Sequence, residues 1–140
     1  MNRFRILIAI ALISVSLTLY CNPVFAQGMQ AARIDKVGIN GEFVEFSITS
    51  SEPFYVGGNS YYLKIGGFNF NRCQQLNIDR KGFIKFFIPL AEYNLLTEKT
   101  PIYLSFGELN APNESKESLD KSCADNVERC KYLGLFSKKM

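Results

Sequence analysis

Residues 42–50 read EFVEFSITS, and this alternation of apolar and polar residues decides the predicted fold class. Val44, Phe46 and Ile48 share one parity, and the residues between them are polar. Successive side chains of a β-strand point to opposite faces, so this stretch predicts a strand with one buried face and one mixed face. Such strands are typical of antiparallel sheets that rest on a core with one side only.

The same period of two recurs along most of the chain. Alternating apolar residues also occupy four further segments, at residues 61–65, 68–70, 84–90 and 102–106. Helix signals are confined to a turn within residues 90–96 and a short helix near Ser118, and a last strand is predicted at residues 132–136. We therefore predict an all-β fold, a small antiparallel β-sandwich of immunoglobulin-like kind, with at most one or two short helices.

Glycine-containing turns separate these segments. Asn40-Gly41 predicts a tight hairpin, because both residues tolerate a positive φ. Residues 79–82 predict a second hairpin with Gly82 in the left-handed conformation, and Gly57-Gly58-Asn59 predicts a third reversal. Gly66-Gly67 interrupts an alternating pattern and predicts a bulge or a bend.

Residues 1–26 have the features of a cleaved secretory signal peptide. Arg3 and Arg5 form a basic start, residues 6–19 form an apolar run, and Val24 and Ala26 suit cleavage after Ala26. The run is shorter than the roughly 20 residues that span a bilayer, which disfavours an anchor and stable membrane insertion after cleavage. A lipidated Cys21 is the alternative, but the residue before it is tyrosine, whereas such sites favour a small one.

Export places residues 27–140, a single predicted domain with a polar, cysteine-containing segment at 111–140, in the periplasm or outside the cell. This compartment is oxidising, so disulfides persist there. Cys123 and Cys130 are the favoured pair, provided that the chain turns back between them, because a continuous helix would hold them about 10.5 Å apart. The alternative is that both cysteines belong to one apolar stripe of a short helix.

Cys73 is the cysteine left over from that pairing. A catalytic role would require a base, and the chain contains no histidine. Arg72 is adjacent in sequence, but neighbouring side chains of a strand point to opposite faces. We therefore expect a buried structural thiol and a monomer, with a Cys73-linked dimer or a Cys73-dependent enzyme as alternatives.

The composition disfavours several classes of function. The net charge is +3, with 16 basic and 13 acidic residues, and removal of Arg3 and Arg5 reduces it to +1. This small charge argues against nucleic acid as a partner. No phosphate-binding loop, nucleophile elbow or zinc-ligand spacing is present, so the sequence predicts no catalytic, cofactor-binding or metal-binding residues.

Aromatic residues give two weak indications of a binding surface. Tyr55, Asn59, Tyr61 and Tyr62 have the composition of an adaptable recognition loop, although Tyr61 has the parity of a core residue. Three phenylalanines fall on the parity opposite to the core, where they are either covered or form an exposed patch, and these are Phe43, Phe83 and Phe87.

These observations favour an exported, non-enzymatic module that binds a protein or glycan or takes part in assembly. The alternative is a secreted inhibitor of an extracellular or periplasmic enzyme that acts through the Cys123–Cys130 loop. Asp125 and Glu128 would then lie at the tip of that loop.

Overall fold

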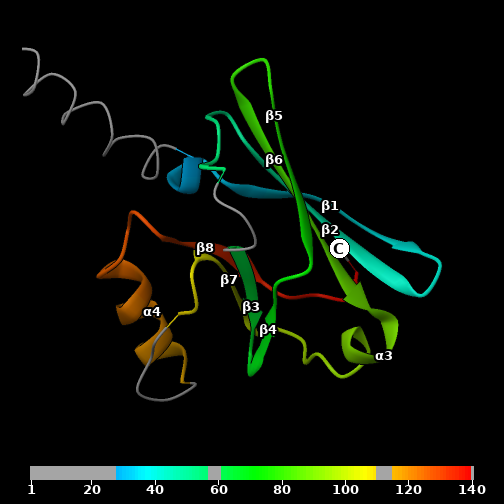
Figure 1. Cartoon of the computed structure of the whole chain (residues 1–140). Helices are drawn as coiled ribbons and strands as arrows, with labels where there is room; N and C mark the ends of the chain where they lie inside the picture. Colours follow the sequence, from blue (N-terminus) through cyan, green and yellow to red (C-terminus); the bar gives the residue numbers. More distant parts are fainter. Residues whose placement is uncertain (1–27, 57–60, 110–114, 140) are drawn as a thin grey trace, which may run out of the picture.

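The computed structural model describes residues 28–56, 61–109 and 115–139. The predicted signal peptide at residues 1–26 and the turn at Gly57-Gly58-Asn59 lie outside the described residues. The described chain forms two four-stranded antiparallel sheets and short helices (Figure 1). The first sheet has the strand order β1 (Arg33–Asn40), β2 (Phe43–Ser50), β6 (Lys81–Pro89), β5 (Cys73–Ile78). The second has the order β4 (Phe68–Phe70), β3 (Tyr61–Ile65), β7 (Pro101–Phe106), β8 (Cys130–Leu135).

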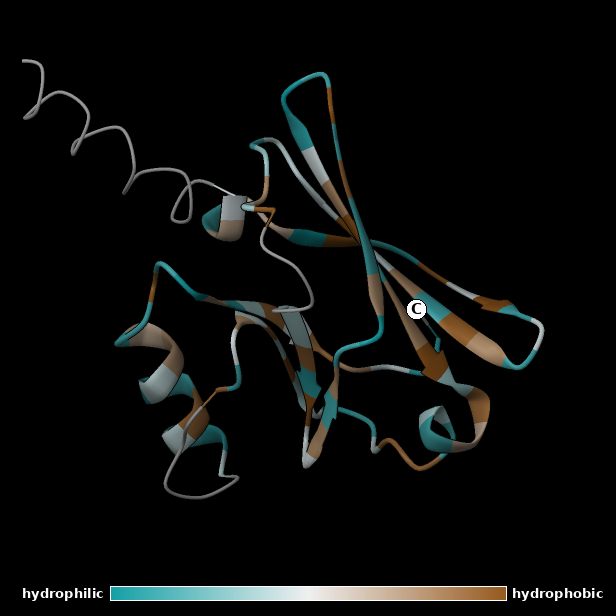
Figure 2. Ribbon diagram, in the orientation of Figure 1, coloured by the Kyte–Doolittle hydropathy of each residue, from teal (hydrophilic) through white to brown (hydrophobic). Residues whose placement is uncertain are grey.

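One hydrophobic core joins the two sheets. The central strands β2, β6, β3 and β7 contribute alternate residues to this core, and most of these inward residues are apolar. These buried residues are Val44, Phe46, Ile48, Ile84, Phe86, Ile88, Leu63, Ile65, Ile102 and Leu104. Figure 2 shows hydrophobic segments along these strands and a hydrophilic tip on the β5–β6 hairpin. The period of two in the sequence therefore corresponds to burial against the facing sheet.

Consecutive strands form hairpins, and the hairpins alternate between the sheets. The chain leaves β2 for the second sheet and returns to the first after β4. It then leaves β6 for the second sheet through helix α3 (Leu90–Tyr93). The β4–β5 crossing is short, and the backbone N–H of Phe87 donates to the carbonyl oxygen of Arg72 at 2.9 Å just before β5 begins.

Two register shifts explain why the first and last strands carry no clear period. In β1 the pairing steps from Ile34 opposite Ile48 to Lys36 opposite Ser47, so Asp35 is an extra residue. An extra residue moves the following side chains to the opposite face of the strand. Before the bulge the inward residues of β1 have even numbers, as Ile34 does, and after it they have odd numbers, as Val37 does. The pairing of β8 with β7 shifts in the same way between Ile102 and Tyr103.

Two of the predicted turns are built differently from the expectation. Gly66-Gly67 is the two-residue loop of the β3–β4 hairpin, with Ile65 opposite Phe68, and is not a bulge in one strand. In the β5–β6 hairpin, Asp79 and Arg80 adopt the positive φ values, of 51° and 64°. Two consecutive residues with positive φ form the turn type that matches the twist of a hairpin, so Gly82 is not needed in the turn.

Gly82 lies within β6, and its small size is required by packing. The ring of Phe54 lies over it, and the side-chain amide of Asn77 on the opposite strand holds the Phe54 backbone. The N–H of Phe54 donates to Asn77 Oδ1 at 3.1 Å, and Asn77 Nδ2 donates to the Phe54 carbonyl oxygen at 2.9 Å. The segment before residue 57 is thereby fixed against the inner side of the hairpin.

Helix α4 (Lys116–Ala124) covers the outer face of the second sheet. Ser115 caps its start, accepting a hydrogen bond from the N–H of Ser118 at 3.2 Å. Leu119 and Cys123 are its buried residues, and they pack against Tyr103 of β7. In Figure 1, α4 lies on the side of the second sheet that faces away from the first.

A methyl group at Gly82 should disturb this packing. A Cβ there would lie 2.4 Å from Phe54 Cδ2 and 2.9 Å from the carbonyl oxygen of Glu52. We expect Gly82→Ala to lower the free energy of unfolding by about 1–3 kcal/mol, measured by chemical denaturation. Gly38→Ala is the control, because its Cβ meets only Lys36 Cε, at 3.9 Å. Equal stability of the two variants would contradict the packing role of Gly82.

Candidate binding surface

The outer face of the first sheet forms a ladder of side chains that face away from the core. The register places Thr49 and Leu76 on either side of Phe83, and Ser47 and Gln74 on either side of Lys85. The apolar members are therefore concentrated at the end that carries the β5–β6 hairpin. We call Leu76, Ile78 and Phe83 the hairpin patch.

Strand β5 presents its apolar side to solvent, unlike the central strands. Leu76 and Ile78 are 56% and 48% exposed, and Phe83 beside them is 37% exposed. The inward positions of β5 are Gln75 and Asn77, and Asn77 is occupied by the Phe54 backbone. The hydrophobic effect disfavours exposed leucine and isoleucine on a strand that has polar alternatives on its other face, so this inversion makes the outer side of β5 a candidate binding surface.

A hollow lies against the hairpin patch. Its volume is about 690 Å³, and it reaches across the sheet as far as Asp35 at the bulge of β1. Lys85 and Gln74 supply polar groups to the wall beside the apolar patch. A concave apolar surface with a few polar groups is the usual form of a binding site.

The other end of the same face is occupied by aromatic and charged groups. The Arg72 guanidinium lies over the Phe43 ring, 4.7 Å from its centroid, and Phe87 is half-buried beside it. Glu45 accepts a hydrogen bond from Asn40 at 2.8 Å and lies 3.5 Å from the Lys85 ammonium. Its pKa is held below the ordinary value by Asn40, with a smaller contribution from Lys85. The charged groups at this end already interact with neighbouring side chains, so fewer of them are available to a ligand.

Phe43, Phe83 and Phe87 therefore all lie outside the core. The second sheet covers none of them, since they point away from it. Phe83 is exposed, whereas Phe43 and Phe87 are half-buried. Their parity in the sequence identified the correct face, but only the structure shows that Leu76 and Ile78 complete the patch with Phe83.

The Cys123–Cys130 segment forms a second exposed feature. The two sulfur atoms are bonded, and the Cα atoms are 5.1 Å apart. Helix α4 ends at Ala124 and β8 begins at Cys130, so the chain turns back between the cysteines as the pairing required. Residues 125–129 are all exposed, and Val127 at 52% is the apolar member.

Hydrogen bonds fix the conformation of this loop at both ends. Asn126 Nδ2 donates to the Ser122 carbonyl oxygen at 2.8 Å, and Gln30 Nε2 donates to the Val127 carbonyl oxygen at 2.6 Å. The N–H of Phe106 donates to the Arg129 carbonyl oxygen at 2.7 Å. The loop is a series of tight turns held to three other parts of the fold.

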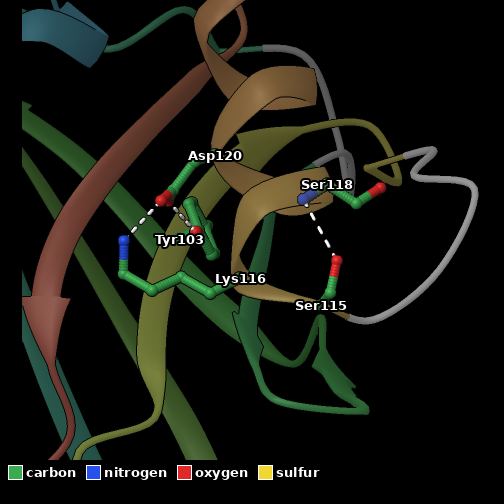
Figure 3. Close-up of polar contacts among 5 residues, drawn as sticks. All are labelled: Tyr103, Ser115, Lys116, Ser118 and Asp120. Carbon is green, nitrogen blue, oxygen red and sulfur yellow. Dashed lines mark hydrogen bonds and ion pairs between the residues drawn. The ribbon is translucent and has the colours of Figure 1, made fainter.

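Asp120 links α4 to the sheet beneath it (Figure 3). It accepts hydrogen bonds from the Tyr103 hydroxyl and from the Lys116 ammonium, the latter at 2.5 Å. Lys116 and, next, Tyr103 hold the pKa of Asp120 below its ordinary value, while burial and Asp120 raise the pKa of Tyr103. Tyr103 is fully buried, so this contact satisfies a hydroxyl that water does not reach. The role of the cluster is to hold the helix in place.

The three tyrosines proposed as a recognition loop differ in their exposure to solvent. Tyr61 lies in the core, where its hydroxyl donates to the Tyr55 carbonyl oxygen at 2.9 Å. Burial raises its pKa. Tyr55 is exposed and packs edge-on against Phe106, and Tyr62 is half-buried on the other side of β3. Asn59 lies outside the described residues.

Cys73 lies at the start of β5, on the inner side of the sheet. It is opposite Phe86 and packs against the core. Burial raises the pKa of its thiol, so the reactive thiolate is disfavoured. Arg72 points to the outer face, over Phe43, and does not offset this effect.

Two further searches concern metals and membranes. In the described part of the chain, no three histidine, cysteine, aspartate or glutamate side chains gather closely enough to hold a metal ion. Within residues 28–56, 61–109 and 115–139, no helix has the length and apolar content needed to cross a membrane.

No family model, curated protein or solved structure matches the chain.

Loss of the disulfide should destabilise the domain. We expect the double variant Cys123→Ser/Cys130→Ser to lose about 2–3 kcal/mol of unfolding free energy, because the bridge closes a short loop. Chemical denaturation measures the loss, and Cys73→Ser is the control that keeps the bridge. A denatured chain of residues 27–140 should titrate one thiol, and a count of three would show that the bridge is absent.

Removal of the Asp120 carboxylate should leave the buried Tyr103 hydroxyl without its acceptor. We expect Asp120→Ala to cost about 1–3 kcal/mol in the wild-type background and markedly less in a Tyr103→Phe background, as measured by a double-mutant cycle. The lowered pKa of Asp120 means that its contribution is present at neutral pH and is lost as the pH falls through that pKa. Glu117→Ala on the same helix is the control, and equal losses in the two backgrounds would exclude the contact.

Proposed function

We propose that this protein is an exported, non-enzymatic binding or assembly module and that the hairpin patch is its binding surface. The observation that carries this proposal is the inverted strand β5, which presents Leu76 and Ile78 to solvent beside Phe83. The outer face of the second sheet is covered by α4, whereas a hollow opens on the outer face of the first. A domain that leaves such a patch uncovered gains free energy when a partner covers it.

The arrangement of strands supports an immunoglobulin-like sandwich as the scaffold. If the eight strands are lettered A, B, C, C′, D, E, F and G in chain order, the first sheet reads A-B-E-D and the second C′-C-F-G. Immunoglobulin domains divide their strands in this way. This chain has no tryptophan, so the conserved tryptophan and disulfide of antibody cores have no counterpart here. Such scaffolds serve many unrelated binding functions, so the surface and not the fold supports the proposal.

Export to the periplasm or the medium is part of the same proposal. Its support is the basic and apolar pattern of residues 1–26, together with the Cys123–Cys130 bridge of the structure. Disulfides persist in oxidising compartments. A partner would accordingly be a protein or a glycan of the cell envelope or the extracellular space.

The alternative is an inhibitor that acts through residues 125–129. In its favour are the five consecutive exposed residues and the bridge that closes the loop. A substrate-like protease inhibitor presents an extended segment to the enzyme. Residues 125–129 form turns, which argues against this type of inhibition. A loop of this kind would instead dock as a preformed surface.

Site-specific photo-cross-linking separates the two proposals. A photoreactive phenylalanine is introduced at Leu76, at Val127, or at Leu95, which is 68% exposed and serves as the control. Each full-length variant is produced in its native cells, which are then irradiated. We expect a discrete cross-linked product from Leu76 only. A product from Val127 alone would support the inhibitor, and no product from Leu76 would contradict the hairpin patch as the binding surface.

A further inference from the structure

We propose that Gln27 becomes the first residue of the exported chain and that its side chain then closes on the new amino group, which forms a pyroglutamyl cap. Val24 and Ala26 suit cleavage after Ala26, and the next residue is glutamine. This modification rests on the export proposed above, because cleavage is what frees the amino group. The packing of the residues that follow Gln27 gives the cap a function.

The chain is packed into the fold from Gly28 onward. Residues 28–30 form a short helical turn beside the start of β1 (Figure 1). Gly28 is buried, and its carbonyl oxygen accepts a hydrogen bond from the buried Ser50 hydroxyl at 2.9 Å. A Cβ at Gly28 would lie 2.5 Å from the Pro53 carbonyl oxygen, so a larger residue does not fit there without movement. One residue, Gln27, separates the predicted cleavage site from this packed position.

Two residues of this first segment belong to the main core. Met29 and Ala32 are 1% and 5% exposed, and both pack in the cluster that joins the two sheets. The N–H of Ala32 donates to the Met29 carbonyl oxygen at 3.2 Å, and the side chain of Gln30 donates to the Val127 carbonyl oxygen. Met29 would be the third residue of the exported chain, so a core side chain lies very close to the new chain end.

The side chain of an N-terminal glutamine can react with its own amino group. The unprotonated α-amino nitrogen attacks Cδ of the side-chain carboxamide, and a new N–Cδ bond closes a lactam ring. The Cδ–Nε2 bond breaks, and Nε2 leaves as ammonia with the proton that the amino group gives up. The pKa of an α-amino group lies close to neutral pH, so a fraction of it is unprotonated there. The reaction consumes no oxidant, reductant or second reactant.

The lactam removes a charge that would lie next to a buried segment. A free amino group at residue 27 would be largely protonated at neutral pH. Its residue is joined directly to Gly28, and consecutive Cα atoms are about 3.8 Å apart. Shielding a charged group from water costs more free energy than shielding an amide. Cyclisation therefore favours the packed position of Gly28 and Met29.

The lactam also blocks digestion from this end of the chain. Chain ends are preferred sites of proteolysis, and aminopeptidases require a free α-amino group. Stepwise removal of residues 27–29 would take Met29 out of the core and leave a cavity. A chain that begins with a lactam offers these enzymes no amino group. The cap thus protects a core residue near the chain end.

Mass spectrometry of the exported chain tests the modification. The full-length chain is produced in its native cells, which are lysed in acidic denaturant so that amino groups are protonated and further cyclisation stops. Trypsin cleaves after Arg33 and yields the peptide 27–33, QGMQAAR. We expect this peptide to have lost one ammonia, and its fragments should place the loss at Gln27 and not at Gln30.

Gln27→Met is the matched control, because its side chain is similar in length and has no carboxamide. Residues 27–33 contain no lysine, so the α-amino group is the single amine of this peptide. An amine-reactive label should modify the peptide of the variant and leave the wild-type peptide unmodified. Ammonia loss in both peptides, or labelling of both, would overturn the cap at Gln27.

Digestion of the folded exported proteins with an aminopeptidase tests the protective role. We expect the wild-type chain to keep its first residue and the Gln27→Met chain to be shortened from this end, as measured by intact mass. Equal shortening of the two proteins, or equal resistance, would overturn protection by the lactam.

The outcomes separate the cap from the proposed function. A chain that begins at Gln27 with a free amino group, or one that is cut at a different bond, would overturn the cap and leave export standing. A chain that keeps residues 1–26 would overturn the cleavage and the cap together. The hairpin patch is tested independently, by photo-cross-linking at Leu76.

Discussion

The structure depends on one constraint, which is that a strand can direct only one of its two faces into the shared core. The central strands β2, β6, β3 and β7 meet this constraint with alternating apolar residues, and the two sheets bury those residues against each other. An apolar side chain on an outer face is then shielded from water only where another element packs over it. Helix α4 supplies that cover for Tyr103 on the second sheet, whereas Phe83 on the first sheet has none among the described residues.

The two outer faces are supported by different contacts. On the second sheet, the disulfide, the buried Tyr103 hydroxyl and the Asp120 carboxylate all hold a helix in place. On the first sheet, the segment around Phe54 holds the inner side of the β5–β6 hairpin, which leaves its outer side free. The hairpin patch thus lies on a supported element, which would reduce the entropic cost of the binding proposed for it.

The sequence predicted the central strands well because their burial imposes a strict period of two. It predicted the Cys123–Cys130 disulfide from the export signal expected at residues 1–26 and from the short spacing of the two cysteines, on the condition that the chain turns back between them, and the structure contains that turn. The predicted hairpin at Asn40-Gly41 implied a strand before residue 40, but the sequence did not show which face of β1 is inward, because the extra residue Asp35 reverses the parity of the inward positions. The sequence also gave no sign that β5 carries Leu76 and Ile78 on its outer face, because alternation alone assigns these residues to a core. The pairing of β5 with β6 and the contact between Asn77 and Phe54 show which face is inward. The role of Gly82 was likewise hidden, since it depends on a segment nearly 30 residues away in sequence.

Leu119, Cys123 and Tyr103 pack apart from the main core, and this affects local unfolding of the domain. These three residues form a cluster with Cys130, and the cluster of the main core does not include them. Regions with few buried contacts open locally at a lower free energy than the global transition. Amides of α4 should therefore exchange with solvent sooner than those of β2 and β6. Reduction of the Cys123–Cys130 bridge should widen this difference, because the bridge joins the end of α4 to the start of β8.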